Sequence, residues 1–92
     1  MPDAARGAVR VQVEGILRET AVAMGTSVDD VRPGAYLGRD LGIDSLGLVT
    51  MAARLGAELG AELAEDLFED ALFKTVDDVV ALCVEAVAGA PR

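Results

Sequence analysis

Residues 45–59 read SLGLVTMAARLGAEL, and this stretch has the most informative apolar pattern in the chain. At 100° per residue, one set of apolar side chains falls on a single helical face. That set consists of Leu48, Met51, Ala52, Leu55 and Leu59. No proline interrupts the stretch, and both Asp44 and Ser45 suit an N-terminal cap. The pattern therefore predicts a helix that begins at Ser45 and buries this face in a core.

A second apolar set, Leu46, Val49 and Ala53, falls on roughly the opposite side of the same helix. A surface helix of a monomer normally carries polar side chains there. The pattern alone leaves two explanations open. Either the helix is central or covered by the preceding loop, or the second set is a docking strip for another protein.

Two further helices are predicted, one on each side of residues 45–59. The first ends at about Met24, because Gly25 occupies a position where helices commonly close in a left-handed turn. Its inner face carries Val9, Val13, Ile16, Leu17, Thr20 and Met24. The last helix follows Thr75, since Asp78 three residues later makes an Asp variant of the capping box. Its inner face carries Val76, Val79, Val80, Cys83 and Val87.

Residues 25–44 are predicted to form a long ordered loop between the first two helices. The segment contains proline and several glycines, with isolated apolar anchors at Val28, Val31, Leu37, Leu41 and Ile43. A loop of this length in so small a domain is a hint of function, because such loops are normally either disordered or working parts.

Residues 56–73 contain acidic residues and no basic one: Glu58, Glu62, Glu65, Asp66, Glu69 and Asp70. Within this run Leu67, Phe68, Ala71 and Leu72 have helical spacing, which predicts a short third helix with an acidic outer side. Such a run is usually a solvated face, but its one-sided charge also favours attraction of basic partners.

The predicted fold is all-α: a small four-helix bundle of three longer helices and one short one, with a long loop between the first two. Alternation of period two is never sustained, so no sheet is expected. Ninety-two residues have room for one core, so residues 1–92 are expected to form a single domain.

The composition excludes several classes of partner. Sixteen acidic residues against eight basic ones give a net charge of −8, which repels phosphate backbones and anionic lipids. With Tyr36, Phe68 and Phe73 as the aromatic residues, little surface is available for stacking bases. We expect neither nucleic-acid nor membrane partners. No apolar run is long enough to span a bilayer, and the chain starts without a signal-peptide core, so a soluble cytoplasmic protein is expected.

The chain is poor in catalytic groups. It lacks histidine, and its single cysteine, Cys83, cannot assemble a thiolate zinc site. The only lysine, Lys74, does not follow a phosphate-loop glycine series, and no segment matches a calcium-binding loop. We therefore expect no catalytic residue and no metal. A small hydrolase or isomerase using Ser45 or Cys83 is the least favoured alternative, since Cys83 lies on the inner face of the last helix.

Ser45 stands at the junction of the long loop and the second helix. It could simply cap the helix, with a loss of about 1 kcal/mol on replacement by alanine. A hydroxyl at this place also suits a covalent phosphate, because the helix dipole and unpaired amides favour an attached anion. For the Asp44-Ser45-Leu46 triplet in isolation, the capping role is the better supported.

Residues 37–46, LGRDLGIDSL, resemble the attachment motif of the acyl carrier proteins and their peptidyl carrier relatives. The resemblance extends from about Val9 to Val87. It implies that Ser45, beside Asp44 of the motif, is esterified by 4′-phosphopantetheine from coenzyme A through a phosphopantetheinyl transferase. The terminal thiol of that group would hold an acyl, polyketide or aminoacyl chain as a thioester.

The resemblance also implies how such a carrier meets its partners. An acyl-loading enzyme and a ketosynthase or other pathway enzymes would dock on the second helix and the acidic run, and a monomer is expected. The expected docking residues are Leu46, Val49, Ala53, Glu65, Asp66, Glu69 and Asp70. The interior between the second and third helices resembles the place where some family members shelter a fatty chain, although ordinary packing is the expected role of its residues: Leu48, Met51, Leu55, Leu67 and Phe68.

Two departures from the family pattern narrow the range of pathways in which the protein is expected to act. Leu37 stands where the family often has phenylalanine, and the second helix carries Gly47, Arg54 and Gly56 where fatty-acid carriers show acidic residues. This favours a dedicated pathway, such as polyketide or other specialised biosynthesis, over primary fatty-acid biosynthesis. The alternatives are an aminoacyl or peptidyl carrier of a nonribosomal pathway and an unmodified carrier-like interaction module.

Overall fold

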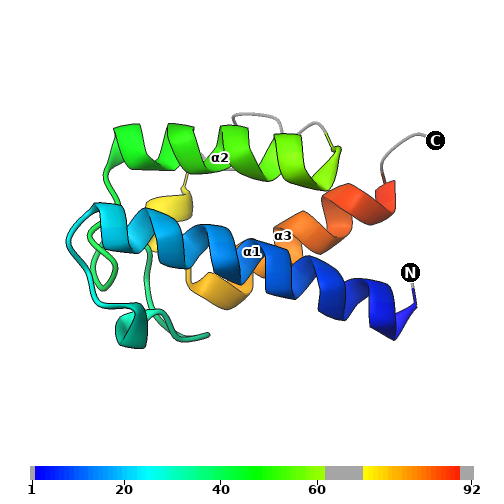
Figure 1. Ribbon diagram of the computed structural model, residues 1–92, viewed down its shortest axis with the longest axis horizontal. Helices are drawn as coiled ribbons and strands as arrows, with labels where there is room; N and C mark the ends of the chain where they lie inside the picture. Colours follow the sequence, from blue (N-terminus) through cyan, green and yellow to red (C-terminus); the bar gives the residue numbers. More distant parts are fainter. Residues whose placement is uncertain (1, 62–69, 90–92) are drawn as a thin grey trace.

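The structure is a computed structural model that describes residues 2–61 and 70–89. It contains three α-helices, α1 (Asp3–Ala23), α2 (Ser45–Leu59) and α3 (Val76–Gly89), and two 3-10 turns, η1 (Val28–Asp30) and η3 (Ala71–Phe73). Helix α1 packs against both α2 and α3 (Figure 1). The described ranges contain no strand, so the expected all-α class is confirmed for them. None of their helices combines the length and hydropathy needed to cross a bilayer.

Helix α1 buries the face that its spacing predicts. Val13 and Leu17 have no exposed surface, and Gly25 has a φ of +89°, as expected for a residue that closes a helix. The exception is Met24, which is 39% exposed. It lies just beyond the last helical residue, and Ala21 takes the inward position in that turn.

Helix α2 has one buried and one exposed apolar face. Met51 and Leu55 have no exposed surface, whereas Leu46 is 75% and Val49 64% exposed. The other members of the inner set, Leu48, Ala52 and Leu59, are partly buried against the core. Ala53, the third member of the outer set, is also exposed. The explanation that the loop covers this outer set, or that α2 is central, is therefore wrong.

The loop between α1 and α2 is ordered by burial and by backbone contacts. Leu37, Leu41 and Ile43 are buried. The amide of Leu37 donates to the carbonyl oxygen of Lys74 at 3.0 Å, and that of Gly38 to Leu72 at 3.0 Å. A Cβ at Gly38 would lie 2.9 Å from the Leu72 carbonyl oxygen, so this close approach requires glycine. The loop is thereby clamped to the segment that leads into α3.

The prediction that Val28 anchors this loop is wrong. Val28 is exposed rather than buried, because it begins the short turn η1, in which the Ser27 hydroxyl accepts a hydrogen bond from the Asp29 amide at 3.3 Å. The turn directs Val28 away from the core. Val31, just after the turn, packs partly against it.

The prediction of a short third helix can be checked only in part, because residues 62–69 lie outside the described ranges. Leu67 and Phe68 lie outside the described residues, while Ala71 and Leu72 belong to the single turn η3. Within the described ranges, a fourth helix is therefore not established.

Helix α3 begins as its capping pattern predicts. The Thr75 hydroxyl accepts a hydrogen bond from the Asp78 amide at 3.2 Å, and the Asp78 carboxylate accepts one from the Thr75 amide at 3.1 Å. On its inner face Cys83 has no exposed surface, and burial raises the pKa of its thiol to about 11. The thiol is therefore protonated at neutral pH and is a core group, not a nucleophile.

Candidate functional site

The structure separates the roles of the two residues that could cap α2. Asp44 is the N-cap, and its Oδ1 accepts a hydrogen bond from the Gly47 amide at 2.8 Å. Ser45 is the first helical residue and is exposed, and within the described residues its hydroxyl makes no hydrogen bond. The explanation of Ser45 as the cap is therefore wrong, and its hydroxyl is available for other chemistry.

The backbone around Ser45 suits an attached anion. The amides of Ser45 and Leu46 have no acceptor among the described residues, because they precede the first hydrogen bond of the helix, from Leu48 to the Asp44 carbonyl. These amides and the positive end of the helix dipole stabilise negative charge at this end of α2. The residues present therefore fit a phosphate ester on the Ser45 oxygen.

Tight packing beneath Ser45 fixes its position. Ile43 and Gly47 are buried on either side of it in the chain. A Cβ at Gly47 would lie 3.3 Å from Asp44 Oδ1 and 3.4 Å from both Ile43 Cγ2 and Met24 Cε. Gly47, which stands where fatty-acid carriers show acidic residues, is small enough to let the first turn of α2 pack closely.

The loop that leads to Ser45 is held by polar contacts that could not be predicted from the sequence. Thr26 Oγ1 donates to the Leu41 carbonyl oxygen at 2.7 Å. Asp40 accepts hydrogen bonds from the Tyr36 amide at 2.7 Å and from Arg39 Nε at 3.3 Å. A threonine just after a helix and an aspartate four residues after a tyrosine are too common to be recognised as loop contacts from sequence alone.

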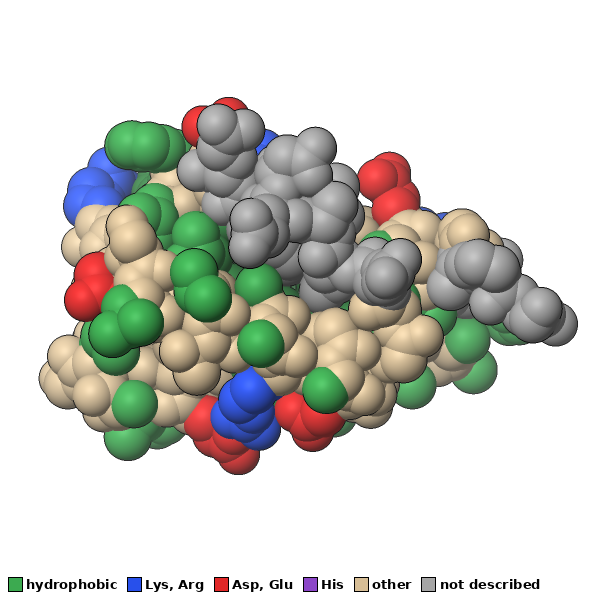
Figure 2. All heavy atoms as spheres, turned by 90° about the horizontal axis from the view of Figure 1, so that it is seen from above, with side chains coloured by type: hydrophobic (Ala, Val, Ile, Leu, Met, Phe, Trp, Pro, Cys, Tyr) green, Lys and Arg blue, Asp and Glu red, His purple; other side chains and the backbone are tan. Residues whose placement is uncertain are grey.

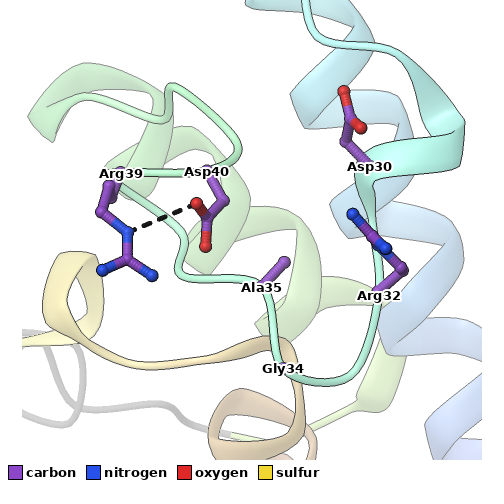
Figure 3. A pocket seen from close by; sticks show the side chains of 6 residues that line it. All are labelled: Asp30, Arg32, Gly34, Ala35, Arg39 and Asp40. Atoms are coloured by element: carbon purple, nitrogen blue, oxygen red, sulfur yellow. Dashed lines mark hydrogen bonds and ion pairs between the residues drawn. The ribbon is translucent and has the colours of Figure 1, made fainter.

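A cavity of about 580 Å³ lies within this loop (Figure 3). In Figure 3, Arg39 and Asp40 face each other on one side, while Asp30 and Arg32 lie on the other. Both oxygens of Asp40 are engaged in holding the loop, and neither Asp44 nor Ser45 lines the cavity. We therefore interpret these polar groups as loop scaffolding and not as the functional site.

The contacts of Asp40 predict a specific pH dependence of stability. The Tyr36 amide, and then the Arg39 guanidinium, hold the pKa of Asp40 below its ordinary value of 3.8. Because the folded pKa is the lower one, this stabilisation is complete above pH 3.8 and is lost as the pH falls through the folded pKa. Asp40→Asn should therefore lower the free energy of unfolding at pH 7, and its difference from wild type should shrink in acid.

Urea unfolding at pH 7 and at successive values below pH 4 measures this difference. Asp30→Asn is the matched control, because Asp30 is an exposed carboxylate of the same loop and its side chain has no hydrogen bond among the described residues. It should follow the wild-type profile. An Asp40→Asn difference that stays constant or grows in acid would contradict the assigned role of Asp40.

The predicted docking residues are only partly described. Leu46, Val49 and Ala53 share the outward face of α2 next to Ser45, and Figure 2 shows hydrophobic side chains gathering toward that end of the helix. Asp70 is exposed just before η3. The other acidic docking residues, Glu65, Asp66 and Glu69, lie outside the described residues.

The basic side chain on α2 is already paired. Arg54 forms ion pairs with Glu19 of α1 and, at 3.2 Å, with Glu58 of α2. Glu58 is the one acidic residue between 45 and 59, and it shares the guanidinium of Arg54 with Glu19. The outer face of α2 is therefore apolar rather than acidic.

The model of a family described as "Phosphopantetheine attachment site" matches residues 14–83. The chain belongs to this family. The resemblance indicated by residues 37–46 is thereby confirmed, and a search of curated proteins found no match.

Membership identifies the chain as a carrier domain. Domains of this family bear covalently attached 4′-phosphopantetheine and carry intermediates without catalysing reactions themselves. They interact in general with phosphopantetheinyl transferases and pathway enzymes. The small number of potential catalytic groups in the sequence agrees with this assignment as a carrier domain.

The assignment of Asp44, and not Ser45, as the cap of α2 can be tested by measuring the stability of variants. Asp44→Ala removes the side chain that caps α2 and should lower the free energy of unfolding by about 1 kcal/mol. Ser45→Ala removes a hydroxyl with no hydrogen bond among the described residues and should change it by less than about 0.5 kcal/mol. Chemical denaturation of both variants measures the two effects, and the reverse order would show that Ser45 is the cap.

Proposed function

We propose that Ser45 is the residue esterified by 4′-phosphopantetheine, so that the chain carries a biosynthetic intermediate. The observation that supports this most strongly is the exposed Ser45 hydroxyl at the first position of α2, which Asp44 leaves free by capping the helix itself. It lies within residues 37–46, the part of the chain that resembles the attachment motif, and inside the matched range 14–83.

Each neighbouring residue contributes to holding the modified serine. Asp44 keeps the first turn of α2 closed, and the amides of Ser45 and Leu46 face an attached phosphate with partial positive charge. When attached, the group supplies a terminal thiol that holds an acyl chain as a thioester. Because the intermediate is covalently tethered to the carrier, its effective concentration at the active site of a docked enzyme is high even when docking is weak.

The outer face of α2 is the proposed docking strip. Leu46 and Val49 expose apolar surface that no described segment covers, directly beside Ser45. Ala53 continues the strip by one turn. A transferase, an acyl-loading enzyme and a ketosynthase or other pathway enzymes would contact this strip. The acidic residues Glu65, Asp66, Glu69 and Asp70 are proposed to add an electrostatic contact with basic patches on these enzymes.

The polarity of α2 favours a dedicated pathway. Its one acidic residue is paired with Arg54, so a helix rich in free acids, as in fatty-acid carriers, is absent from residues 45–59. We therefore place the carrier, as a monomeric domain of residues 1–92, in polyketide or other specialised biosynthesis. An aminoacyl or peptidyl carrier of a nonribosomal pathway is the alternative, and the mass of the natural load distinguishes the two.

Incubation with coenzyme A and a phosphopantetheinyl transferase, followed by trypsin digestion, tests the attachment. The group should appear on the peptide of residues 40–54, which contains Ser45 as its only serine, and fragment ions should separate Ser45 from Thr50. Ser27 falls in the separate peptide of residues 19–39, because trypsin does not cleave between Arg32 and Pro33. An unchanged mass would remove the proposed attachment, and partner binding by such a bare protein would favour an unmodified interaction module.

A further inference from the structure

The turn that closes α1 contacts the chain on both sides of Ser45. On the side that precedes Ser45, Thr26 Oγ1 donates to the Leu41 carbonyl oxygen at 2.7 Å. On the other side, a Cβ at Gly47 would lie 3.4 Å from Met24 Cε, so the methionine methyl group packs on the first turn of α2. The two helices run side by side, with the C-terminal end of α1 next to the start of α2 (Figure 1). The end of α1 therefore supports the segment that carries the proposed attachment residue.

Thr26 is held in place by α1 itself. Its amide donates to the Ala21 carbonyl oxygen at 2.9 Å, and the Gly25 amide donates to that of Val22 at 2.9 Å. Together with the positive φ of Gly25, these two bonds form the Schellman motif that ends many helices. Ala21 has no exposed surface, so the motif is anchored in the core. The Thr26 hydroxyl is therefore a fixed hydrogen-bond donor.

The acceptor of this hydrogen bond lies at the bend that leads to Ser45. Gly42, the residue after Leu41, has a φ of +68°, and Leu41 and Ile43 on either side of it are buried. Among the described residues, Thr26 is the one donor to the Leu41 carbonyl oxygen. Removing the hydroxyl would leave that carbonyl without a protein partner at a half-buried place, which favours a shift of the bend.

The first turn of α2 depends on this bend, because no earlier helical turn holds it. Asp44 ties the turn only from within, by accepting a hydrogen bond from the Gly47 amide. If the bend moves, Asp44 moves with it, and the Ser45 oxygen loses its fixed direction. Val49 and Ala53 of the docking strip lie beyond the first turn and would keep their places on the outer face. A shift of the bend therefore affects the reacting oxygen more than it affects docking.

We propose that Thr26 is a positioning residue for the modification, whose hydroxyl holds the bend at Leu41 so that the Ser45 oxygen is presented in the geometry that the transferase requires. The inference rests on the proposed attachment at Ser45. In that reaction the Ser45 oxygen bonds to the phosphorus next to pantetheine in coenzyme A, and the pyrophosphate bond breaks. The leaving group is 3′,5′-adenosine bisphosphate, and the serine proton passes to a base of the transferase. Misplacing the reacting atoms by about 1 Å can cost about 100-fold in rate.

Steady-state kinetics of a phosphopantetheinyl transferase, with the carrier as the varied substrate and coenzyme A saturating, test this role. Thr26→Val removes the hydroxyl and keeps the branched shape, so kcat should fall about tenfold or more while KM for the carrier stays within about twofold. Thr26→Ser keeps the hydroxyl and should retain kcat within about twofold. Thr20→Val is the matched control, because it removes a hydroxyl that donates to the Ile16 carbonyl oxygen within α1 at 2.8 Å. It should leave kcat unchanged.

The separation of kcat from KM distinguishes positioning from a loss of stability. Because the carrier is the substrate, a variant that is merely less folded acts as a diluted substrate, with a higher apparent KM and an unchanged kcat. An unchanged kcat for Thr26→Val would overturn the positioning role and leave the proposed function intact. A folded Thr26→Ser protein with a kcat lower by about tenfold would do the same, and this arm does not require the valine variant to fold. Failure of the wild-type chain to be modified at Ser45 would overturn both.

Discussion

Ser45→Ala is expected to gain no phosphopantetheine from coenzyme A and a transferase, whereas the wild-type chain gains one group. The reason is chemical: the variant lacks the exposed hydroxyl at the first position of α2 and keeps the Asp44 cap that orders the helix. The loss should therefore be complete while the fold persists. Intact mass spectrometry measures the modification, and circular dichroism with thermal unfolding establishes that the variant is folded.

Ser27→Ala is the matched control for this experiment. Ser27 is the other serine of the chain, is also exposed, and has a hydroxyl that accepts a hydrogen bond from the Asp29 amide. Its replacement should leave the gain in mass unchanged. A folded Ser45→Ala protein that still acquires the group would move the attachment to another hydroxyl.

The second large effect is expected in the core of the bundle. Leu55→Ala should lower the free energy of unfolding by about 2–5 kcal/mol, because Leu55 has no exposed surface and its truncation leaves a cavity. Leu46→Ala makes the same chemical change on the same helix at a residue that is 75% exposed, so the expected change is within about 0.5 kcal/mol. Urea denaturation of the two variants provides the comparison.

This leucine pair also separates the two faces of α2 by function. Leu46→Ala should weaken turnover by partner enzymes at nearly unchanged stability, since Leu46 belongs to the proposed docking strip. Similar stability losses in both variants would mean that the outer face of α2 is covered in solution, which would remove the docking strip.

The inner and outer faces of α2 could be predicted from sequence because helical periodicity is a local property. Met51 and Leu55 are buried and Val49 is exposed, in agreement with their angular positions. What periodicity could not decide was whether another segment covers the outer face. Whether the outer face is covered depends on the path of residues 25–44. In the structure Leu37, Leu41 and Ile43 of this loop are buried, and its backbone bonds to the segment between η3 and α3, so the loop runs away from the outer face of α2.

The predicted start of α2 at Ser45 is confirmed, but the residue that caps the helix could be identified only from the structure. Aspartate and serine are both good N-caps, so sequence could not distinguish a helix capped by Ser45 from one capped by Asp44. The hydrogen bond from the Gly47 amide to Asp44 identifies Asp44 as the cap, which leaves the Ser45 hydroxyl free. The motif in residues 37–46 indicated which serine matters, while the geometry indicates why its oxygen is available.

Electrostatic contacts between helices were beyond the reach of sequence reasoning. The acidic run suggested free negative charge, but Glu58 is paired with Arg54, which also reaches Glu19 on α1. Glu19 and Arg54 are far apart in the sequence and meet only because α1 and α2 pack together. The short third helix shows the opposite case, since its residues Leu67 and Phe68 lie outside the described ranges and their predicted helix stays a prediction.

The most direct test of the account is peptide mapping of the protein purified from its native host without added transferase. We predict that the tryptic peptide of residues 40–54 carries 4′-phosphopantetheine on Ser45, and that the group bears the natural acyl load wherever the thioester survives. A native protein in which Ser45 is always unmodified, or in which the group is attached to another residue, would contradict it.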